Sequence, residues 1–180
     1  MSDLAVRFDE LPTRDGGRIG VATLNAPKSL NALSLEMIHQ LDAKLEAWAV
    51  DRSVVAVLLE GSGDKAFCAG GDVVALYRSL TEEGENRGAG RDGIFAETYF
   101  AAEYRLDHRI HTYPKPLMVW GDGIVMGGGL GLMAGGFQRL ATETTRIAMP
   151  EITIGLYPDI GASWFLGRMP AGVGAYLGLT

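Results

Sequence analysis

Hydrophobic and polar residues alternate most clearly in Arg18–Leu24, where β-branched residues are also frequent. This period of two predicts a strand, and the turn residues at positions 25–27 end it. Ser34 then has the chemistry of a helix N-cap. Apolar residues recur behind it at helical spacing, namely Ile38, Leu41, Leu45 and Trp48. The pattern therefore predicts an amphipathic helix lying on a core.

The next apolar segment, residues 54–59, is uninterrupted, which is typical of a strand buried on both faces. Turn residues follow at 61–65, and a second helix is predicted to begin at Asp72. Residues 81–91 are rich in Gly, Glu, Asn and Arg and predict a mobile surface loop. A further helix is expected from about Ile94 to His111.

The remaining sequence repeats the order of strand, glycine loop and helix. A strand is predicted at 116–120, a glycine-dense loop at 121–129 and a short helix at 130–134. Short strands are expected at 140–142 and 146–149, and the small and apolar residues from Gly161 onward favour tightly packed helices. This rhythm indicates an α/β fold, and 180 residues suit one domain, residues 1–180.

Composition narrows the class of protein. A hydrophobic fraction of 47% with 21% charged residues indicates a folded chain. A net charge of −6 argues against a nucleic-acid partner. The single cysteine, Cys68, can form no internal disulfide, and the first residues resemble neither a signal nor a transit peptide, so we expect a cytoplasmic protein. Residues 117–135 have the length of a membrane helix, but Asp122 and several glycines interrupt them, so we expect no span.

Two glycine loops each follow a strand and precede a helix, at Ala69, Gly70 and Gly71 and at 127–129. Free backbone N–H groups at such places stabilise negative charge, and two of them aimed at one point form an oxyanion hole. Two alternatives stay open. The glycines can serve turns alone, or Gly129, Gly131 and Ala134 can belong to a dinucleotide fingerprint with Glu151 as its acidic residue.

Carboxylates provide the candidate chemistry. Glu103 shares the apolar helix face of Tyr99, Leu106 and Ile110, so it is either paired in a salt bridge or functional. Glu151 and Asp159 each stand beside a proline that restricts the backbone, which suits general acid–base or nucleophilic work. His108 and His111 near Asp107 raise a metal site, but no third ligand has a diagnostic spacing, so we expect no metal.

Several ordered blocks resemble the crotonase (enoyl-CoA hydratase/isomerase) superfamily: residues 25–27, 31–33, 65–72, 126–129 and 148–151. Four details look most like the 3-hydroxyisobutyryl-CoA hydrolases within it, at residues 68–72, 103–104, 126–132 and 155–161. The resemblance implies a spiral core of ββα repeats with surrounding helices. It also implies further helices beyond Thr180, which would cover the site and help to hold CoA.

The same resemblance implies roles for particular residues. Ala69 and Gly128 would form the oxyanion hole, Gly70, Gly71 and Asp72 would help to bind substrate, and Glu103, Glu151 and Asp159 would surround the acyl group. Hydratases carry a glutamate at the position of Gly131, so hydrolysis of a short 3-hydroxyacyl-CoA is favoured over hydration or isomerisation. No cofactor is expected beyond the CoA of the substrate. Trimers or pairs of trimers are implied, and an inactive fragment or a non-catalytic assembly protein is the alternative of another class.

Overall fold

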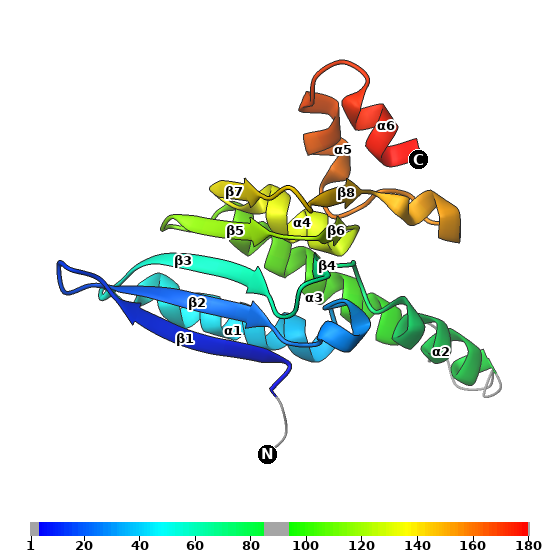
Figure 1. Ribbon diagram of the computed structural model, residues 1–180. Coiled ribbons are helices and arrows are strands. Elements are labelled where there is room, and N and C mark those ends of the chain that lie inside the picture. Colours follow the sequence, from blue (N-terminus) through cyan, green and yellow to red (C-terminus); the bar gives the residue numbers. More distant parts are fainter. Residues whose placement is uncertain (1–3, 85–93, 180) are drawn as a thin grey trace.

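The computed structural model describes residues 4–84 and 94–179 (Figure 1). Its strands are β1 (Val6–Pro12), β2 (Arg18–Leu24), β3 (Val54–Gly61), β4 (Ala66–Cys68), β5 (Leu117–Gly121), β6 (Ile124–Met126), β7 (Gln138–Ala141) and β8 (Arg146–Ala148). Its helices are α1 (Leu35–Val50), α2 (Val73–Gly84), α3 (Ile94–His111), α4 (Gly128–Gly135), α5 (Ala162–Phe165) and α6 (Val173–Leu179). Short 3-10 helices are η1 (Pro27–Ser29), η2 (Pro150–Ile154) and η3 (Leu166–Arg168).

The strands form two sheets. The larger has the order β1-β2-β3-β5-β7, in which β1 is antiparallel to β2 and the other pairs are parallel. The smaller has the order β4-β6-β8 and is parallel throughout. From β3 onward each pair of strands gives its first member to the larger sheet and its second to the smaller; α2 follows the first pair, α4 the second and η2 the third. The ββα repeat implied by the resemblance is therefore present.

Helix α1 confirms the prediction made from its apolar spacing. The Ser34 hydroxyl accepts a hydrogen bond from the Met37 N–H at 3.2 Å, so Ser34 is the N-cap. The predicted face of α1 is buried in the core, with Ile38 fully buried and Trp48 1% exposed. Helix α3 has the predicted bounds and contacts both α1 and α4, which places it between the N-terminal half and the glycine loops.

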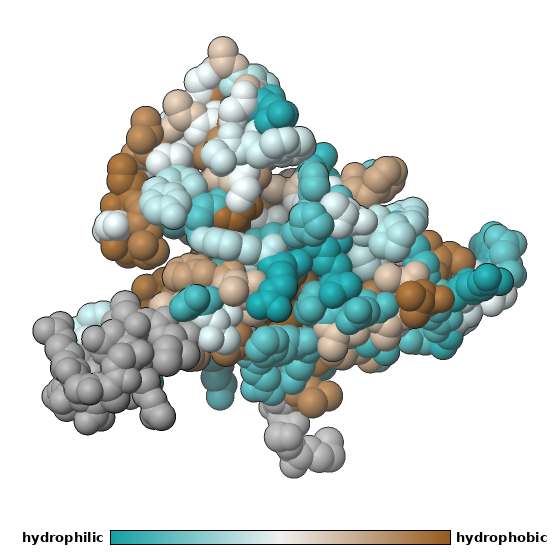
Figure 2. Space-filling view, turned by 180° about the vertical axis from the view of Figure 1, so that it is seen from behind, coloured by the Kyte–Doolittle hydropathy of each residue, from teal (hydrophilic) through white to brown (hydrophobic). Residues whose placement is uncertain are grey.

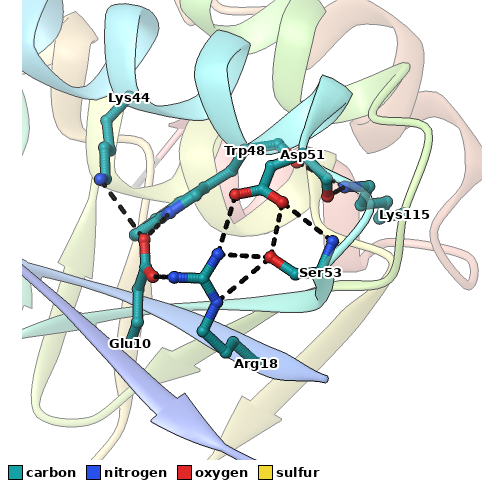
Figure 3. A network of polar contacts seen from close by, with 7 residues as sticks. All are labelled: Glu10, Arg18, Lys44, Trp48, Asp51, Ser53 and Lys115. Carbon is teal, nitrogen blue, oxygen red and sulfur yellow. Dashed lines mark hydrogen bonds and ion pairs between the residues drawn. The ribbon is translucent and has the colours of Figure 1, made fainter. Parts of the chain in front are cut away.

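A polar network fastens the sheet to α1 at the end remote from the glycine loops (Figure 3). Arg18 on β2 binds Glu10 on β1 and, at 3.0 Å, Asp51 at the end of α1. The Trp48 indole donates to Glu10 at 2.8 Å, which lowers the pKa of that carboxyl below its ordinary value. Lys115, just before β5, donates to the Trp48 and Asp51 carbonyls. The network joins four segments of the chain that carry no candidate chemistry.

Asn31 holds the approach to the first glycine loop. It is fully buried and adopts a left-handed conformation, which asparagine tolerates better than most residues. Its side-chain amide donates to the Ser62 and Ala66 carbonyls and accepts from the Ala26 N–H, each at 2.9 Å. One side chain therefore satisfies three backbone groups, two in segments that precede β4 and one at its first residue.

We expect Asn31→Ala to lower the free energy of unfolding by about 2–4 kcal/mol, because three backbone groups lose their partner at once. Urea denaturation measures this change. The matched control is Asn25→Ala, since Asn25 makes one exposed hydrogen bond, to the Leu4 carbonyl. A loss below ~1 kcal/mol for Asn31→Ala would show that these bonds contribute little net stability.

Two strand predictions need correction. Strand β3 is not buried on both faces: Val57 and Leu59 are buried, but Val55 is 48% exposed. The register between β2 and β3 shifts by one residue beside Val55, so the apolar run contains a bulge that resets the alternation. Residues 121–129 are not simply a loop either, because Ile124–Met126 pairs with β4 and β8. Those partners are distant in sequence, which local pattern does not reveal.

The C-terminal segment is less tightly packed than its small residues suggested. Gly174 on α6 packs against the Leu166 backbone, but Trp164 is 52% and Leu179 67% exposed. Figure 2 shows hydrophobic surface along the left edge of this upper part of the molecule, whereas the rest of it is pale or hydrophilic. In the described part of the chain no helix is long and apolar enough to cross a membrane. Of the loop expected at 81–91, residues 81–84 end α2 and the rest lie outside the described residues.

Candidate active site

The two glycine loops meet because the strands before them are neighbours. Strands β4 and β6 are parallel and adjacent, so the loops after Cys68 and after Met126 leave the same edge of the smaller sheet (Figure 1). Gly70 has φ +114°, and a Cβ on it would lie 3.3 Å from the Met126 carbonyl. A Cβ on Gly128 would lie 3.5 Å from the Gly71 nitrogen. Glycine suits position 70 because of its positive φ, and the missing side chains let the two backbones approach each other closely.

The Ala69 N–H does not have the free donor role that was predicted for it. The Ala69 N–H donates to the Leu30 carbonyl at 3.0 Å, so it is not free to bind a ligand. Gly128 is the first residue of α4, where an N–H has no partner within the helix. Among the described residues no acceptor is found for the N–H groups of Gly71 and Gly128. The free pair of donors is therefore Gly71 with Gly128.

Asp72 and Gly70 have structural contacts in the first loop. The Asp72 carboxylate accepts from the Ala75 N–H at 3.0 Å and so caps α2, as the sequence predicted. The Asp72 N–H donates to the Leu33 carbonyl at 3.0 Å, and the Leu33 N–H donates to the Gly70 carbonyl at 2.8 Å. These bonds hold the loop so that the Gly71 N–H stays unpaired.

Glu103 reaches the second loop from α3. It is 3% exposed, and it takes part in no hydrogen bond or salt bridge with any residue that the structure describes. A Cβ on Gly128 would collide with its Oε1, so the carboxyl lies directly on the Gly128 backbone. Burial, with smaller contributions from Asp159 and Glu151, raises the pKa of Glu103 to about 8. No salt bridge to Glu103 is found among the described residues, and its raised pKa favours the neutral carboxyl at pH 7.

Glu151 approaches the same point from η2, where Pro150 begins the helical turn. It is 8% exposed, its Oε1 lies 2.8 Å from the Cβ position of Gly127, and its buried Oε2 has no partner among the described residues. Burial raises its pKa, and the charge of Asp159 adds to the shift. A buried carboxylate oxygen without a partner, on a side chain that lies against the second glycine loop, is suited to act on a bound ligand.

Asp159 is the third predicted carboxylate, and it acts electrostatically on both glutamates. The Tyr104 hydroxyl donates to its Oδ2 at 2.5 Å, and the Asp159 carbonyl accepts from the Ala162 N–H at 2.7 Å. Its charge raises the pKa of both Glu103 and Glu151, so the three predicted carboxylates lie in one cluster. The structure thus brings together side chains from α3, η2 and the segment before α5.

A fourth carboxylate, Asp107, was not predicted as part of this group. Both of its oxygens are buried and lack a hydrogen-bond partner in the described structure. Burial, followed by the charges of Glu103 and Asp159, raises its pKa well above the ordinary value. The signal was present in the sequence, because Asp107 is one helical turn beyond Glu103 and therefore on the same face.

A cavity of about 590 Å³ opens beside these side chains. Tyr104, Asp107, Asp159 and Trp164 are among its lining residues. Its size lies within the range of small-molecule sites. Asp107 and Asp159 therefore border a space that can receive part of a ligand, whereas Glu103 and Glu151 are not among its lining residues.

The dinucleotide alternative does not fit the contacts of the glycines. A Cβ on Gly129 would lie 2.8 Å from Cβ of Cys68, and one on Gly131 would lie 2.6 Å from Cδ1 of Ile160. Both glycines serve packing inside the protein, whereas the fingerprint requires glycines that face a pyrophosphate. Cys68 is fully buried and its pKa is raised to about 12, which fits a packing role rather than that of a nucleophile.

The histidines do not assemble a metal centre. Both His108 and His111 are exposed. Across residues 4–84 and 94–179, no group of three or more His, Cys, Asp or Glu side chains could hold a metal ion.

Comparison with known proteins gives one consistent family. The profile of the enoyl-CoA hydratase/isomerase family matches residues 19–180. A mitochondrial 3-hydroxyisobutyryl-CoA hydrolase of Gallus gallus is 46% identical over 173 residues, which are 96% of this chain and 42% of that protein. A carnitinyl-CoA dehydratase structure from Mycobacterium thermoresistibile has a TM-score of 0.86 at 42% identity, covering 98% of this chain and 48% of that one. The expected crotonase-like fold is confirmed.

One similar protein has a name of another kind. A small ribosomal subunit protein of Neurospora crassa is 47% identical over 158 residues, which are 87% of this chain and 30% of that protein. This chain spans less than half of the length of the curated relatives that it matches.

The names of the hydrolase relatives contradict the expected cytoplasmic location, because those of Gallus gallus, Xenopus tropicalis and Danio rerio are all named as mitochondrial. The expectation rested on a single cysteine and on the first residues of the chain. A protein without disulfides is stable in the cytoplasm and in an organelle alike, so that observation could not distinguish the two. The family assignment does not depend on location: the chain belongs to the enoyl-CoA hydratase/isomerase family.

Proposed function

We propose that this site hydrolyses the thioester of a short 3-hydroxyacyl-CoA similar to 3-hydroxyisobutyryl-CoA. One observation carries the proposal: the Glu151 carboxylate, whose buried Oε2 has no partner among the described residues, lies against Gly127, next to Gly128, which with Gly71 has a free N–H group. A general base next to a pair of backbone donors is the arrangement that acyl transfer requires. The names of the hydrolase relatives support the same substrate class.

In the proposed reaction the thioester oxygen accepts hydrogen bonds from Gly71 and Gly128. Glu151 removes a proton from water as the water oxygen attacks the carbonyl carbon, and negative charge develops on the thioester oxygen. The C–S bond then breaks, and Glu151 returns the proton to the CoA sulfur, so that the products are the free acid and the CoA thiol. Each donor aimed at the developing charge is worth about 3 kcal/mol in the transition state.

A second route gives Glu151 a different first step. Its carboxylate attacks the carbonyl carbon, CoA leaves, and water hydrolyses the resulting anhydride. Single-turnover hydrolysis in ¹⁸O-labelled water distinguishes the routes, because attack of water on the Glu151 carbonyl of the anhydride places the label in the protein. In both routes Glu151 must be ionised.

Two other carboxylates suit supporting roles. Neutral Glu103 on the Gly128 backbone adds no negative charge beside the oxyanion, whereas an ionised group there would oppose it. Asp159 already accepts a hydrogen bond from Tyr104 at Oδ2, and its second oxygen can accept one from the substrate hydroxyl. The 3-hydroxy group is thus the part of the substrate that Asp159 recognises.

The two alternatives have separate support. Solved structures similar to this chain include an enoyl-CoA hydratase of Rhodobacter sphaeroides 2.4.1, at 38% identity, but no glutamate stands at Gly131. The similar ribosomal protein favours a non-catalytic assembly role, since one fold hosts unrelated functions. A homo-oligomer, a trimer or pair of trimers, belongs to the main proposal and is measured by analytical ultracentrifugation.

One assay tests these possibilities together. We expect the protein to release free thiol fastest from 3-hydroxyisobutyryl-CoA, more slowly from other 3-hydroxyacyl-CoA thioesters, and slowest from unsubstituted acyl-CoA. Crotonyl-CoA, followed by loss of its enoyl absorbance, reports hydration. Faster hydration than cleavage would favour the hydratase. Absence of both reactions together with absence of acyl-CoA binding in calorimetry would favour the assembly protein.

A further inference from the structure

Gly131 on α4 has no side chain, and the side chain of Ile160 packs against its backbone. A Cβ on Gly131 would lie 2.6 Å from Cδ1 and 2.9 Å from Cβ of Ile160. Real Cβ atoms do not approach other carbons this closely, so any side chain at position 131 must displace Ile160. Ile160 is 8% exposed and belongs to the core. The two residues form a close contact between α4 and the segment that carries Asp159.

The backbone of Ile160 is held in an unfavourable conformation. Its φ is +44°, in the left-handed region, where a β-branched residue is a rare outlier. Such strain persists only where the surrounding structure compensates for it, and it gathers at functional sites. The contact of the Ile160 side chain with Gly131 is the compensation that the structure offers.

The strained residue directly follows Asp159. The side chain of Ile160 packs on α4, and the carboxylate of the preceding residue, Asp159, accepts a hydrogen bond from the Tyr104 hydroxyl. The turn closes at Gly161, φ +81°, and at the bond from the Ala162 N–H to the Asp159 carbonyl. Movement of Ile160 off Gly131 therefore rotates the backbone that aims Asp159.

We propose that Ile160, seated on Gly131, is the positioning residue that holds the Asp159 carboxylate against Tyr104 and so carries the preference for hydroxylated acyl groups. The second part rests on the function proposed above. An acidic side chain at this position would also begin next to a carboxylate, because a Cβ on Gly131 would lie 3.3 Å from Oδ1 of Asp107. The bare backbone of Gly131 is thus a requirement of this arrangement.

Two variants disturb the contact from opposite sides. Ile160→Gly removes the side chain and suits the positive φ, so that the fold is retained. Gly131→Ala keeps Ile160 but forces it away. For both we expect the ratio of kcat/KM for 3-hydroxyacyl-CoA to kcat/KM for unsubstituted acyl-CoA to fall by roughly 10- to 100-fold. Ile160→Val keeps a branched side chain and should retain most of the wild-type ratio of the two kcat/KM values.

The matched control is Ile154→Gly, because Ile154 is 53% exposed and lies at the end of η2. Since the two disruptive variants break the same contact, their combination should lower the ratio no further than either does alone. An unchanged ratio in both Ile160→Gly and Gly131→Ala would overturn the inference, as would an equal loss in Ile154→Gly.

A second measurement needs no substrate. In protein labelled with 3-fluorotyrosine, the ¹⁹F resonance of Tyr104, assigned with Tyr104→Phe, reports the hydrogen bond to Asp159. We expect this resonance to move in Ile160→Gly and Gly131→Ala and to stay in place in Ile154→Gly. A resonance that stays in place in all three overturns the positioning role. If it moves as expected while the wild-type protein cleaves no thioester, the positioning role is supported and the proposed hydrolase function fails.

Discussion

Replacing Glu151 with glutamine is expected to lower kcat for thioester cleavage by about 10²–10⁴-fold, the usual contribution of a positioned general base. Glutamine has the shape of glutamate but accepts no proton, so the substrate still binds. We expect KM to change little and the loss to appear in kcat. Steady-state release of free thiol from 3-hydroxyisobutyryl-CoA measures both constants.

The control for this experiment is Glu143→Gln, because Glu143 is an exposed glutamate in the turn after β7. The pH dependence provides a further check. Since burial raises the pKa of Glu151 and its ionised form is the active one, wild-type activity should rise with pH through that raised pKa. Thioester cleavage at the wild-type rate in Glu151→Gln would exclude Glu151 as the base.

Stability is expected to fall as the pH is raised from 5 to 8, and Glu103 to be a principal cause. In the unfolded chain a glutamate ionises near its ordinary pKa of 4.5, whereas in the folded protein Glu103 ionises at about 8. Between these values folding takes up a proton, so stability from this group is complete below pH 4.5 and is lost as the pH rises through 8. The slope is on the order of 1 kcal/mol for each pH unit.

Glu103→Gln removes this titration while keeping the volume of the side chain. We expect the variant to lose much of the slope and to be more stable than the wild-type protein at pH 8, as measured by urea denaturation across pH. Glu97→Gln is the control, since Glu97 is an exposed residue of the same helix. An unchanged slope in Glu103→Gln would mean that Glu103 is ionised in the folded protein well below pH 8.

Much of the local structure could be predicted because it depends on neighbours in sequence. The Ser34 cap, the core face of α1 and the bounds of α3 follow from side-chain chemistry and from a spacing of three or four residues. Glu103 was identified for the same reason, as a carboxylate on an apolar face. Strand β6 was missed because its partners, β4 and β8, are far away in the chain.

Most residues of the site were predicted, but not all of their roles. Sequence and resemblance indicated Glu103, Glu151, Asp159 and the two loops, and the structure brings them together. They could not indicate that the Ala69 N–H donates a hydrogen bond to the Leu30 carbonyl, because that bond depends on how one loop packs against another. Nor did they indicate that Asp107 is buried without a partner.

The sequence by itself determined which chemical groups this protein has and where its longer helices α1, α2 and α3 begin, since both depend on residue type and short spacing. Only the tertiary structure decided which of those groups work together. Neutral Glu103 and unpartnered Glu151 result from burial by distant segments, and the free pair of Gly71 and Gly128 results from the adjacency of β4 and β6. Burial and backbone hydrogen bonding are properties of the packed chain, so no local pattern could supply them.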